Sequence, residues 1–126
     1  MRDEWGRSIH YLRLSVTDRC NLRCRYCMPE GVARCEHGDV LTYEEFLRLA
    51  RLFAACGVDT VRVTGGEPLV RREVHRLVAG LKQTPGIRRV ALTTNGVLLA
   101  EQLPDLLAAG LDSVNISLDA LSSEVY

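Results

Sequence analysis

Short runs of strand-forming residues alternate with amphipathic stretches along this chain of 126 residues. Residues 11–16, 60–64, 89–93 and 113–118 predict strands, because these runs are rich in β-branched residues or alternate apolar with polar positions. Apolar residues recur at helical spacing within 46–53, 74–81 and about 100–109, which predicts helices between the strands. Such alternation is typical of right-handed crossovers in a parallel sheet. The sequence therefore predicts an α/β fold.

Residues that begin or end helices stand at the expected boundaries. Thr42 and Glu45 form the pattern of a capping box at the start of the first helix, and Gly57 is placed to end it. In the last predicted helix, we expect Pro104 near the first turn and Gly110 just past the end.

The fourth predicted strand lies close to the end of the chain. A parallel sheet normally needs cover on both faces. A closed barrel of alternating parallel strands and helices has more than four strands. We expect residues 1–126 to form a single incomplete domain, the N-terminal part of a (βα) parallel barrel truncated after about four strands. The alternative is a small open α/β domain that is complete as it stands.

The composition excludes several classes of protein. With 47% apolar residues the chain can build a core, so intrinsic disorder is disfavoured. Sixteen basic residues balance sixteen acidic ones, which argues against a protein that coats nucleic acid or anionic lipid. No run approaches the ~18 apolar residues of a membrane helix, and the first residues contain no apolar signal segment. We therefore expect a cytoplasmic protein without a nucleic-acid or membrane partner.

The five cysteines carry most of the chemical information. Cys20, Cys24 and Cys27 follow the first predicted strand with the spacing C-x-x-x-C-x-x-C. Cys35 and Cys56 stand apart and are interpreted as ordinary thiols. An odd number of cysteines without a signal segment disfavours a disulfide framework. Thiolates are preferred ligands of iron–sulfur clusters, and three thiolates on a cubic cluster leave one iron open to a further ligand.

The same cysteines allow two other interpretations. A structural zinc ion could take Cys20, Cys24 and Cys27 together with Cys35 or His37. Cys24 and Cys27 alone match a redox-active Cys-x-x-Cys pair, although this interpretation leaves Cys20 unexplained.

Polar motifs follow the second, third and fourth predicted strands. They are Thr-Gly-Gly-Glu-Pro at 64–68, Thr-Thr-Asn-Gly at 93–96 and Ser-Leu-Asp at 117–119. Each alone is typical of a tight turn or a helix cap. Because successive parallel strands end at the same edge of a sheet, we expect these motifs and the cysteines to converge on one site.

The cysteine triplet, with Tyr26 directly before its last member, resembles the signature of the radical S-adenosylmethionine (SAM) superfamily. The resemblance implies a 4Fe-4S cluster on Cys20, Cys24 and Cys27, with SAM on the open iron. It also implies reductive cleavage of SAM and hydrogen abstraction from a substrate by the 5′-deoxyadenosyl radical. In this superfamily the protein binds and orients, while the cofactor carries the chemistry.

The runs at 11–21, 61–69, 92–96 and 114–119 resemble, in order and spacing, the GTP 3′,8-cyclase family of molybdenum-cofactor biosynthesis. The resemblance covers the chain from about residue 7 to its end and implies a role for matching positions. Contacts with SAM are implied for Tyr26, Gly66 and Ser117. Contacts with GTP are implied for Arg13, Arg62 and Thr93, and guanidinium groups do suit phosphate.

The family resemblance also implies a reaction and partners. The reaction is the conversion of GTP to (8S)-3′,8-cyclo-7,8-dihydro-GTP by a lyase, with electrons from a donor such as flavodoxin or ferredoxin. A homodimer and a second 4Fe-4S cluster, held by three cysteines near the C-terminus, are implied as well. No second triplet occurs here, so we expect this chain alone to lack cyclase activity. The alternatives are another radical SAM enzyme, peptide-maturing or deazapurine-forming, and a zinc-stabilised α/β module without enzymatic activity.

Overall fold

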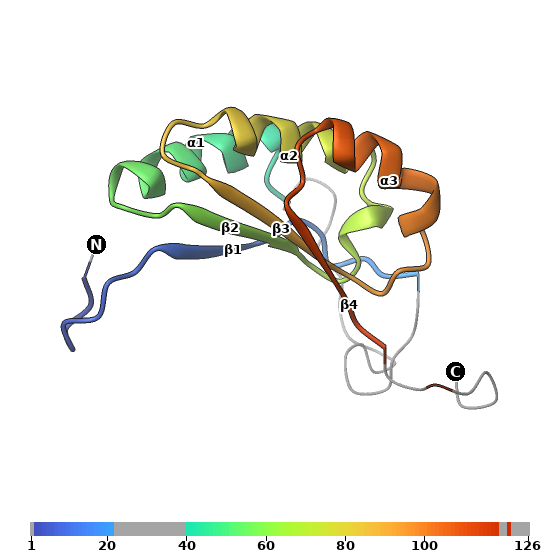
Figure 1. The fold of residues 1–126 in the computed structure, drawn as a ribbon, viewed down its shortest axis with the longest axis horizontal. Coiled ribbons are helices and arrows are strands. Elements are labelled where there is room, and N and C mark those ends of the chain that lie inside the picture. Colours follow the sequence, from blue (N-terminus) through green and yellow to red (C-terminus); the bar gives the residue numbers. More distant parts are fainter. Residues whose placement is uncertain (1, 22–39, 119–120, 122–126) are drawn as a thin grey trace.

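The computed structural model describes residues 2–21, 40–118 and 121. Strands and helices alternate along the chain (Figure 1). In order they are β1 (Tyr11–Ser15), α1 (Tyr43–Ala55), β2 (Thr60–Thr64), the short 3-10 helix η2 (Pro68–Val70), α2 (Val74–Gln83), β3 (Arg89–Thr94), α3 (Leu99–Ala108) and β4 (Ser113–Ile116). Within the described residues, no helix is both long enough and apolar enough to span a bilayer.

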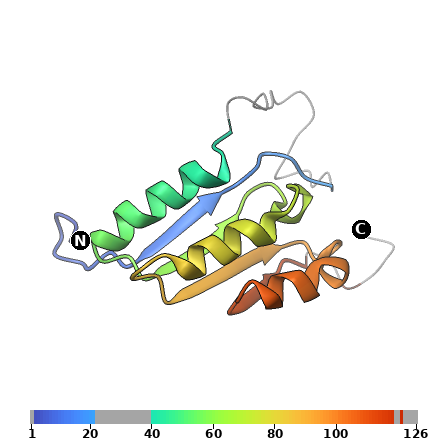
Figure 2. The ribbon, with the colours of Figure 1, turned by 90° about the horizontal axis from the view of Figure 1, so that it is seen from above.

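The strands form one parallel sheet in the order β1-β2-β3-β4. In this order every crossover steps to the next strand in the same direction. Right-handed crossovers that all step the same way place their helices on the same face of the sheet. α1, α2 and α3 accordingly cover one face and leave the other open (Figures 1 and 2). The α/β prediction is confirmed, and the arrangement is that of a partial barrel.

The hydrophobic core lies between the helices and the covered face of the sheet. In β2 the burial pattern alternates, so that Val61 and Val63 are fully buried while their neighbours are only partly so. Every helix contributes an apolar stripe to this layer. The core includes Leu14, Phe46, Ala50, Val61, Val63, Val74, Leu77, Val78, Leu81, Val90, Leu92 and Leu106.

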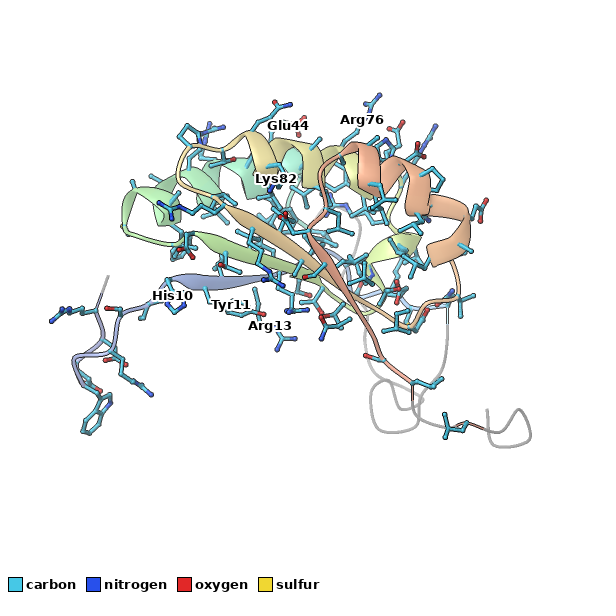
Figure 3. All side chains as sticks on the ribbon, in the orientation of Figure 1. His10, Tyr11, Arg13, Glu44, Arg76 and Lys82 are labelled. Atoms are coloured by element: carbon cyan, nitrogen blue, oxygen red, sulfur yellow. The ribbon has the colours of Figure 1, made fainter. Side chains whose placement is uncertain are left out.

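The open face of the sheet is polar. Side chains alternate across a strand, so the residues between the core positions point to this face. Figure 3 shows Tyr11 and Arg13 directed from β1 away from the helix layer. Arg62 of β2, Thr93 of β3 and Asn115 of β4 join them there, because hydrogen bonds connect Arg62 with Tyr11, Thr93 and Asn115.

Most predicted boundaries are confirmed. Thr42 caps α1 through a capping box, because its Oγ1 accepts from the Glu45 N–H at 3.2 Å and its N–H donates to Glu45 Oε2 at 2.7 Å. Gly57, with φ of 105°, follows the end of that helix. The position of Pro104 is a correction, since it lies inside α3 rather than near its first turn. α3 begins at Leu99, within one residue of the expected start, so Pro104 is its sixth residue and lies in the second turn, where its missing N–H removes one intrahelical hydrogen bond.

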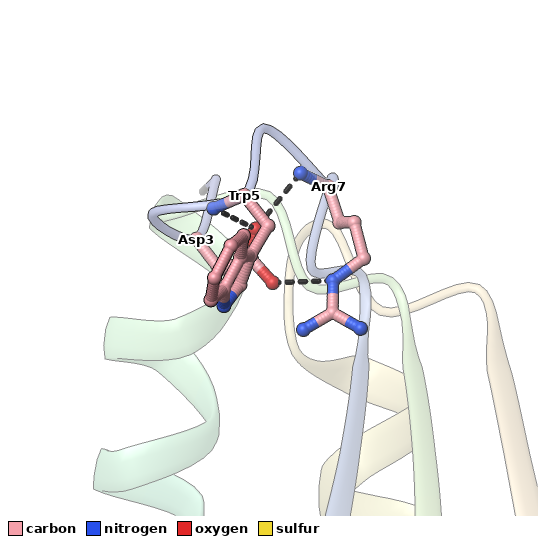
Figure 4. A network of polar contacts seen from close by, with 3 residues as sticks. All are labelled: Asp3, Trp5 and Arg7. Carbon is pink, nitrogen blue, oxygen red and sulfur yellow. Dashed lines mark hydrogen bonds and ion pairs between the residues drawn. The ribbon is translucent and has the colours of Figure 1, made fainter.

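A local turn precedes β1 and lies apart from the layers. The carboxylate of Asp3 accepts hydrogen bonds from the backbone N–H groups of Trp5 and Arg7 and from Arg7 Nε, at 3.0, 2.9 and 2.6 Å (Figure 4). The backbone bond from Arg7 is the largest cause that lowers the pKa of Asp3, with desolvation opposing it. This turn leads the chain into the sheet from the end opposite the predicted site.

Asp112 ties α2, β3 and β4 together at the amino ends of the strands. Its Oδ2 accepts from Val90 N–H at 2.8 Å and from Lys82 Nζ at 2.9 Å, and Lys82 Nζ also reaches Arg88 O at 3.0 Å. Desolvation raises the pKa of Asp112, but the Val90 bond and the Lys82 ammonium outweigh it, so the pKa is lowered. A lowered pKa means that the ionised carboxylate stabilises the fold above the ordinary carboxyl pKa, and that this stability is lost as pH falls through the lowered value.

We predict that Asp112→Asn lowers the free energy of unfolding at pH 7 by about 1 kcal/mol, because the ion pair is lost while an oxygen acceptor for Val90 remains. The difference from the wild type should shrink below about pH 4, where the wild-type carboxylate itself becomes protonated. Urea unfolding at several pH values measures this. Asp105→Asn, on the exposed side of α3, is the control. The prediction would be contradicted if the difference in free energy of unfolding between the wild type and Asp112→Asn were the same at pH 3 as at pH 7.

Candidate functional site

The carboxyl ends of the strands meet at one edge of the sheet, where the sequence motifs were expected to converge. Backbone hydrogen bonds join the segments that follow the strands. Gly66 N–H donates to Thr17 O and Glu67 N–H to Arg19 O, both at 2.7 Å, and Ser117 N–H donates to Thr94 O at 2.9 Å. These bonds bring the segment that leads into Cys20 next to the Gly-Gly-Glu-Pro turn.

Glu67 is the buried centre of this edge, with only 1% of its surface exposed. Its carboxylate accepts from Thr94 Oγ1 at 2.5 Å, from Asn95 N–H at 2.7 Å and from Leu69 N–H at 3.2 Å. A buried polar group is tolerated only when hydrogen bonds within the protein replace those to water. Glu67 therefore fixes the turn after β2 against the end of β3.

Gly66 is needed for close packing of the backbone. A Cβ at this position would lie 2.7 Å from Asp18 O and closer still to Arg19 O. Both atoms belong to the backbone of the segment before Cys20, so they cannot move aside as a flexible side chain could. The sequence suggested a glycine that lets a ligand approach, and in the structure the same glycine already lets the segment 18–19 approach.

Asn95 connects the end of β3 to the first cysteine. Its Nδ2 donates to Asn21 Oδ1 at 2.7 Å and to Cys20 Sγ at 3.8 Å. Its Oδ1 accepts from Val97 N–H at 3.1 Å, which closes a turn after the strand. The Cys20 thiol, partly buried, therefore lies against the motif that follows β3.

Several predicted ligands lie outside the described residues, namely Cys24, Tyr26, Cys27, Cys35 and His37. Within the described part of the chain, no three His, Cys, Asp or Glu side chains gather as a metal site. What the structure does describe fits an iron–sulfur cluster, because Cys20 offers a soft thiolate donor at the edge where the strands end.

Arg71 clamps the two ends of the cysteine-containing segment. Its Nη1 donates to Val16 O and its Nη2 to Leu41 O, both at 2.7 Å. The guanidinium also lies 4.4 Å from the centroid of the Tyr43 ring and 5.6 Å from that of Phe46. One side chain thus joins the residue after β1 to the residues that begin α1, at the base of the segment that carries the triplet.

Tyr43 helps to hold Arg71 in place. Its hydroxyl donates to Arg72 O at 2.6 Å, which anchors the ring under the guanidinium. Burial raises the pKa of the Tyr43 phenol, with the Arg71 charge acting in the opposite direction. The phenol therefore stays protonated at neutral pH and keeps its role as a donor.

Arg62 is held on the open face by three other strands' side chains. Its Nε donates to Tyr11 Oη at 2.6 Å, and its Nη1 donates to Thr93 Oγ1 at 3.0 Å and Asn115 Oδ1 at 3.1 Å. These bonds use Nε and one edge of the guanidinium and orient the group in advance. Thr93, predicted as a substrate contact, thus positions Arg62 and retains a hydroxyl hydrogen to donate.

Arg13 and Arg62 form a pair of like charges. They are partners in the parallel register of β1 and β2, and neighbouring strands lie only about 4.8 Å apart. Within the described residues, neither arginine forms an ion pair with a carboxylate. Facing like charges are unfavourable unless an anion lies between them or near both. The open face therefore presents two neighbouring cationic side chains that have no carboxylate partner among the described residues.

Five residues at or near the site carry no role that the sequence predicts, namely Tyr11, Asn115, Glu67, Asn95 and Arg71. Tyr11 could have been found, because it alternates with Arg13 in the same predicted strand and so shares its face. Glu67 and Asn95 were noted only as parts of turn motifs. Nothing in the local sequence marks Arg71, since its partners lie 55 and 30 residues away.

One family model matches most of the chain. Residues 14–126 match the model of the radical SAM superfamily. The chain belongs to the radical SAM superfamily. Membership in this superfamily implies a 4Fe-4S cluster and SAM as cofactors. The sequence resemblance is confirmed at this level.

Two bacterial GTP 3′,8-cyclases are similar to this radical SAM chain over almost its whole length. The protein of Geobacter sulfurreducens is 53% identical over 125 residues, which are 98% of this chain and 38% of that protein. That of Heliobacterium modesticaldum is 58% identical over 127 residues, or 100% of this chain and 39% of the relative. Human molybdenum cofactor biosynthesis protein 1 is 52% identical over 96% of this chain and 19% of its own length. The chain thus spans well under half the length of these relatives.

Two solved structures of BtrN have the same architecture as this chain. The structure of BtrN in complex with AdoMet and 2-DOIA superposes with a TM-score of 0.69 over 92% of this chain and 48% of BtrN, at 20% sequence identity. BtrN in an open conformation gives 0.67 over 94% of this chain and 54% of its own. At this identity the likeness concerns the fold alone.

We predict that Arg71→Met lowers the free energy of unfolding by about 1.5–3 kcal/mol, because two hydrogen bonds from a charged group are lost while the apolar stem remains. Urea unfolding of the cofactor-free protein measures it. Arg72→Met is the matched control, since the Arg72 side chain is exposed and only its carbonyl accepts a bond. Equal losses for the two variants would contradict the clamp.

Proposed function

We propose that this chain is the N-terminal part of a radical SAM lyase that converts GTP to (8S)-3′,8-cyclo-7,8-dihydro-GTP, the first step of molybdenum-cofactor biosynthesis. The identities of 53% and 58% to two enzymes named GTP 3′,8-cyclase support this substrate and product. The one structural observation that carries the proposal is the facing pair Arg13 and Arg62, held on the open face of the sheet beside the cysteine edge.

The triphosphate of GTP is the anion that this pair would receive. Arg62 keeps the two N–H groups of Nη2 for phosphate oxygens, because Nε and Nη1 are already hydrogen-bonded, and Arg13 adds the guanidinium fork that a lysine could not supply. Arg62 is already oriented by Tyr11, Thr93 and Asn115, so it loses little side-chain freedom when phosphate binds. Its neighbour Arg13 is exposed and can adjust to the same anion.

The cofactor side of the proposal involves residues at the strand ends. Cys20, Cys24 and Cys27 would hold the 4Fe-4S cluster, and Tyr26, Gly66 and Ser117 would contact SAM. Gly66 and Ser117 lie on the turns that hydrogen bonds join to the Cys20 segment and to β3. When bound, the cluster and SAM supply the radical chemistry of the superfamily. The chain's own residues would bind and orient SAM at the edge where the strands end and GTP on the open face of the same sheet.

The proposal extends to the rest of the protein and its surroundings. Residues 1–126 would form the first part of the radical SAM domain, and a later segment would add the second 4Fe-4S cluster that binds guanine. An electron donor such as flavodoxin or ferredoxin, a homodimer and a cytoplasmic location belong to the same proposal. The shares of 38% and 39% of the two bacterial relatives leave room for that segment.

We predict that anaerobic reconstitution of the 126-residue chain yields about four irons per chain, as one cubic cluster requires. Cys20→Ala should abolish the bound iron, because a cluster ligand is removed. Cys56→Ala, an exposed thiol after α1, is the control and should leave it unchanged. Iron analysis and the absorption spectrum measure both. Stoichiometric zinc without iron would refute the cluster.

We predict that Arg62→Ala in the whole protein weakens GTP binding roughly tenfold to a hundredfold and leaves SAM binding within twofold, because a charge-assisted phosphate contact is lost. Calorimetric titration with each ligand measures this. Arg89→Ala is the control, because Arg89 lies on the same face at the opposite end of β3. Equal losses of GTP and SAM affinity for Arg62→Ala would contradict a role in phosphate binding.

A further inference from the structure

Asn95 lies directly after β3, at the edge where the strands end. Its position is fixed by hydrogen bonds, and no function has been assigned to it above. Its backbone N–H is bound to the buried carboxylate of Glu67 at 2.7 Å, directly after the last residue of β3. That carboxylate also accepts from Thr94 Oγ1, so two consecutive residues are held by one buried group. The Cα of Asn95 therefore has little freedom relative to the sheet.

The side-chain amide of Asn95 has a defined orientation. Its Oδ1 accepts from Val97 N–H at 3.1 Å, and only the oxygen of the amide can accept. The NH2 group must then face the other way, where Asn21 Oδ1 lies at 2.7 Å and Cys20 Sγ at 3.8 Å. One hydrogen is available for each of these two acceptors. The bond that closes the turn thus directs the NH2 group of Asn95 toward the sulfur of Cys20.

We propose that Asn95 is a positioning residue for the cluster, whose amide donates an N–H···S hydrogen bond to the Cys20 thiolate and raises the reduction potential of the cluster. This inference rests on the proposed role of Cys20 as a cluster ligand. It adds a residue that touches neither iron nor substrate but acts through the sulfur that binds iron.

Electrostatics determines the direction of the effect. A hydrogen bond to a ligand sulfur places a partial positive charge beside the cluster. Reduction adds an electron, so this positive charge stabilises the reduced state more than the oxidised state. The bond also strengthens when the thiol of Cys20 becomes a thiolate, because hydrogen bonds to an ionised acceptor are stronger. Asn95 therefore favours both retention of the cluster and its reduction.

The network behind Asn95 explains how the donor is kept in place. Glu67, buried in the Gly-Gly-Glu-Pro turn, fixes the backbone of Asn95, while Glu67 N–H donates to Arg19 O next to Cys20. The donor and the thiol are thus both attached to the turn after β2. A shift of one relative to the other would break either the bond from Asn95 N–H to the buried carboxylate or the backbone bond from Glu67 N–H to Arg19 O, and either loss is costly.

Two substitutions separate the hydrogen bond to sulfur from the turn. Asn95→Ser and Asn95→Asp both keep a side-chain oxygen that can accept from Val97 N–H, and both lack the amide donor. Asn95→Asp also adds a negative charge near the sulfur. The matched control is Asn21→Ala, which removes the oxygen partner of the same NH2 group and leaves the bond to Cys20 Sγ.

The experiment is a redox titration of the reconstituted holoprotein. The reduced cluster is monitored by its EPR signal, and a change in this signal on addition of SAM identifies the cluster that binds SAM. We expect Asn95→Ser to shift the midpoint potential to more negative values, and Asn95→Asp to shift it further. A tenfold loss in the relative stability of the reduced state corresponds to about 59 mV for one electron. Release of iron to a chelator should be about tenfold faster in both variants, as is typical when a partner of a metal ligand is lost.

Structural effects are measured separately on the cofactor-free protein. The midpoint of its urea unfolding should be unchanged in Asn95→Ser, and Asn21→Ala should leave the potential unchanged. A lowered unfolding midpoint with an unaltered potential would show that Asn95 serves only the turn and would overturn the inference. An equal potential shift in Asn21→Ala would overturn it as well.

Failure of the inference is distinguishable from failure of the proposed function. If Cys20→Ala loses its iron and the Asn95 variants keep the wild-type potential, only the inference is wrong. If Cys20→Ala keeps a full cluster, Cys20 is not a ligand, and both the proposed ligand set and the role of Asn95 are overturned.

Discussion

A single buried carboxylate organises the functional edge of this protein. Glu67 lies in the turn after β2 and accepts hydrogen bonds from the side chain of Thr94 and from the backbone of Asn95 at the end of β3. Because a buried polar group must keep its hydrogen-bond partners, the two strand ends cannot separate without a large cost in free energy. The segment before Cys20 packs on the same turn, across Gly66. The geometry at the first cysteine thus depends on one buried side chain and its hydrogen bonds.

The one-sided cover of the sheet divides stability from function. The strand order β1-β2-β3-β4 places all the helices on one face, and the apolar side chains of the strands follow them there. The opposite face is then available for polar groups, including Arg13 and Arg62, whose charges would be intolerable in the core. Two neighbouring arginines can therefore lie on the same strands whose other face packs in the core.

The local sequence was sufficient for the elements and for the class of fold. The capping box of Thr42 and Glu45 and the β-branched run that forms β2 are short-range patterns, and both appear in the structure as predicted. Pro104 shows the limit of such patterns. Its place inside α3 departs from the preference of proline for the first turn of a helix, so local propensity did not predict it. The cysteine spacing likewise indicated a cluster, because ligand type and spacing are properties of the sequence itself.

The sequence by itself determined the alternation of strands and helices, the shared edge of the strand-end motifs and the superfamily. Only the tertiary structure decided which side chains meet. Asn95 and Cys20 are 75 residues apart, Arg62 and Asn115 53, and Arg71 and Val16 55. Such pairs depend on strand order, on register and on the exact path of turns. Periodicity reports only the face on which a residue lies, because hydrogen bonds act over about 3 Å and a pattern along the chain carries no information on distances across it.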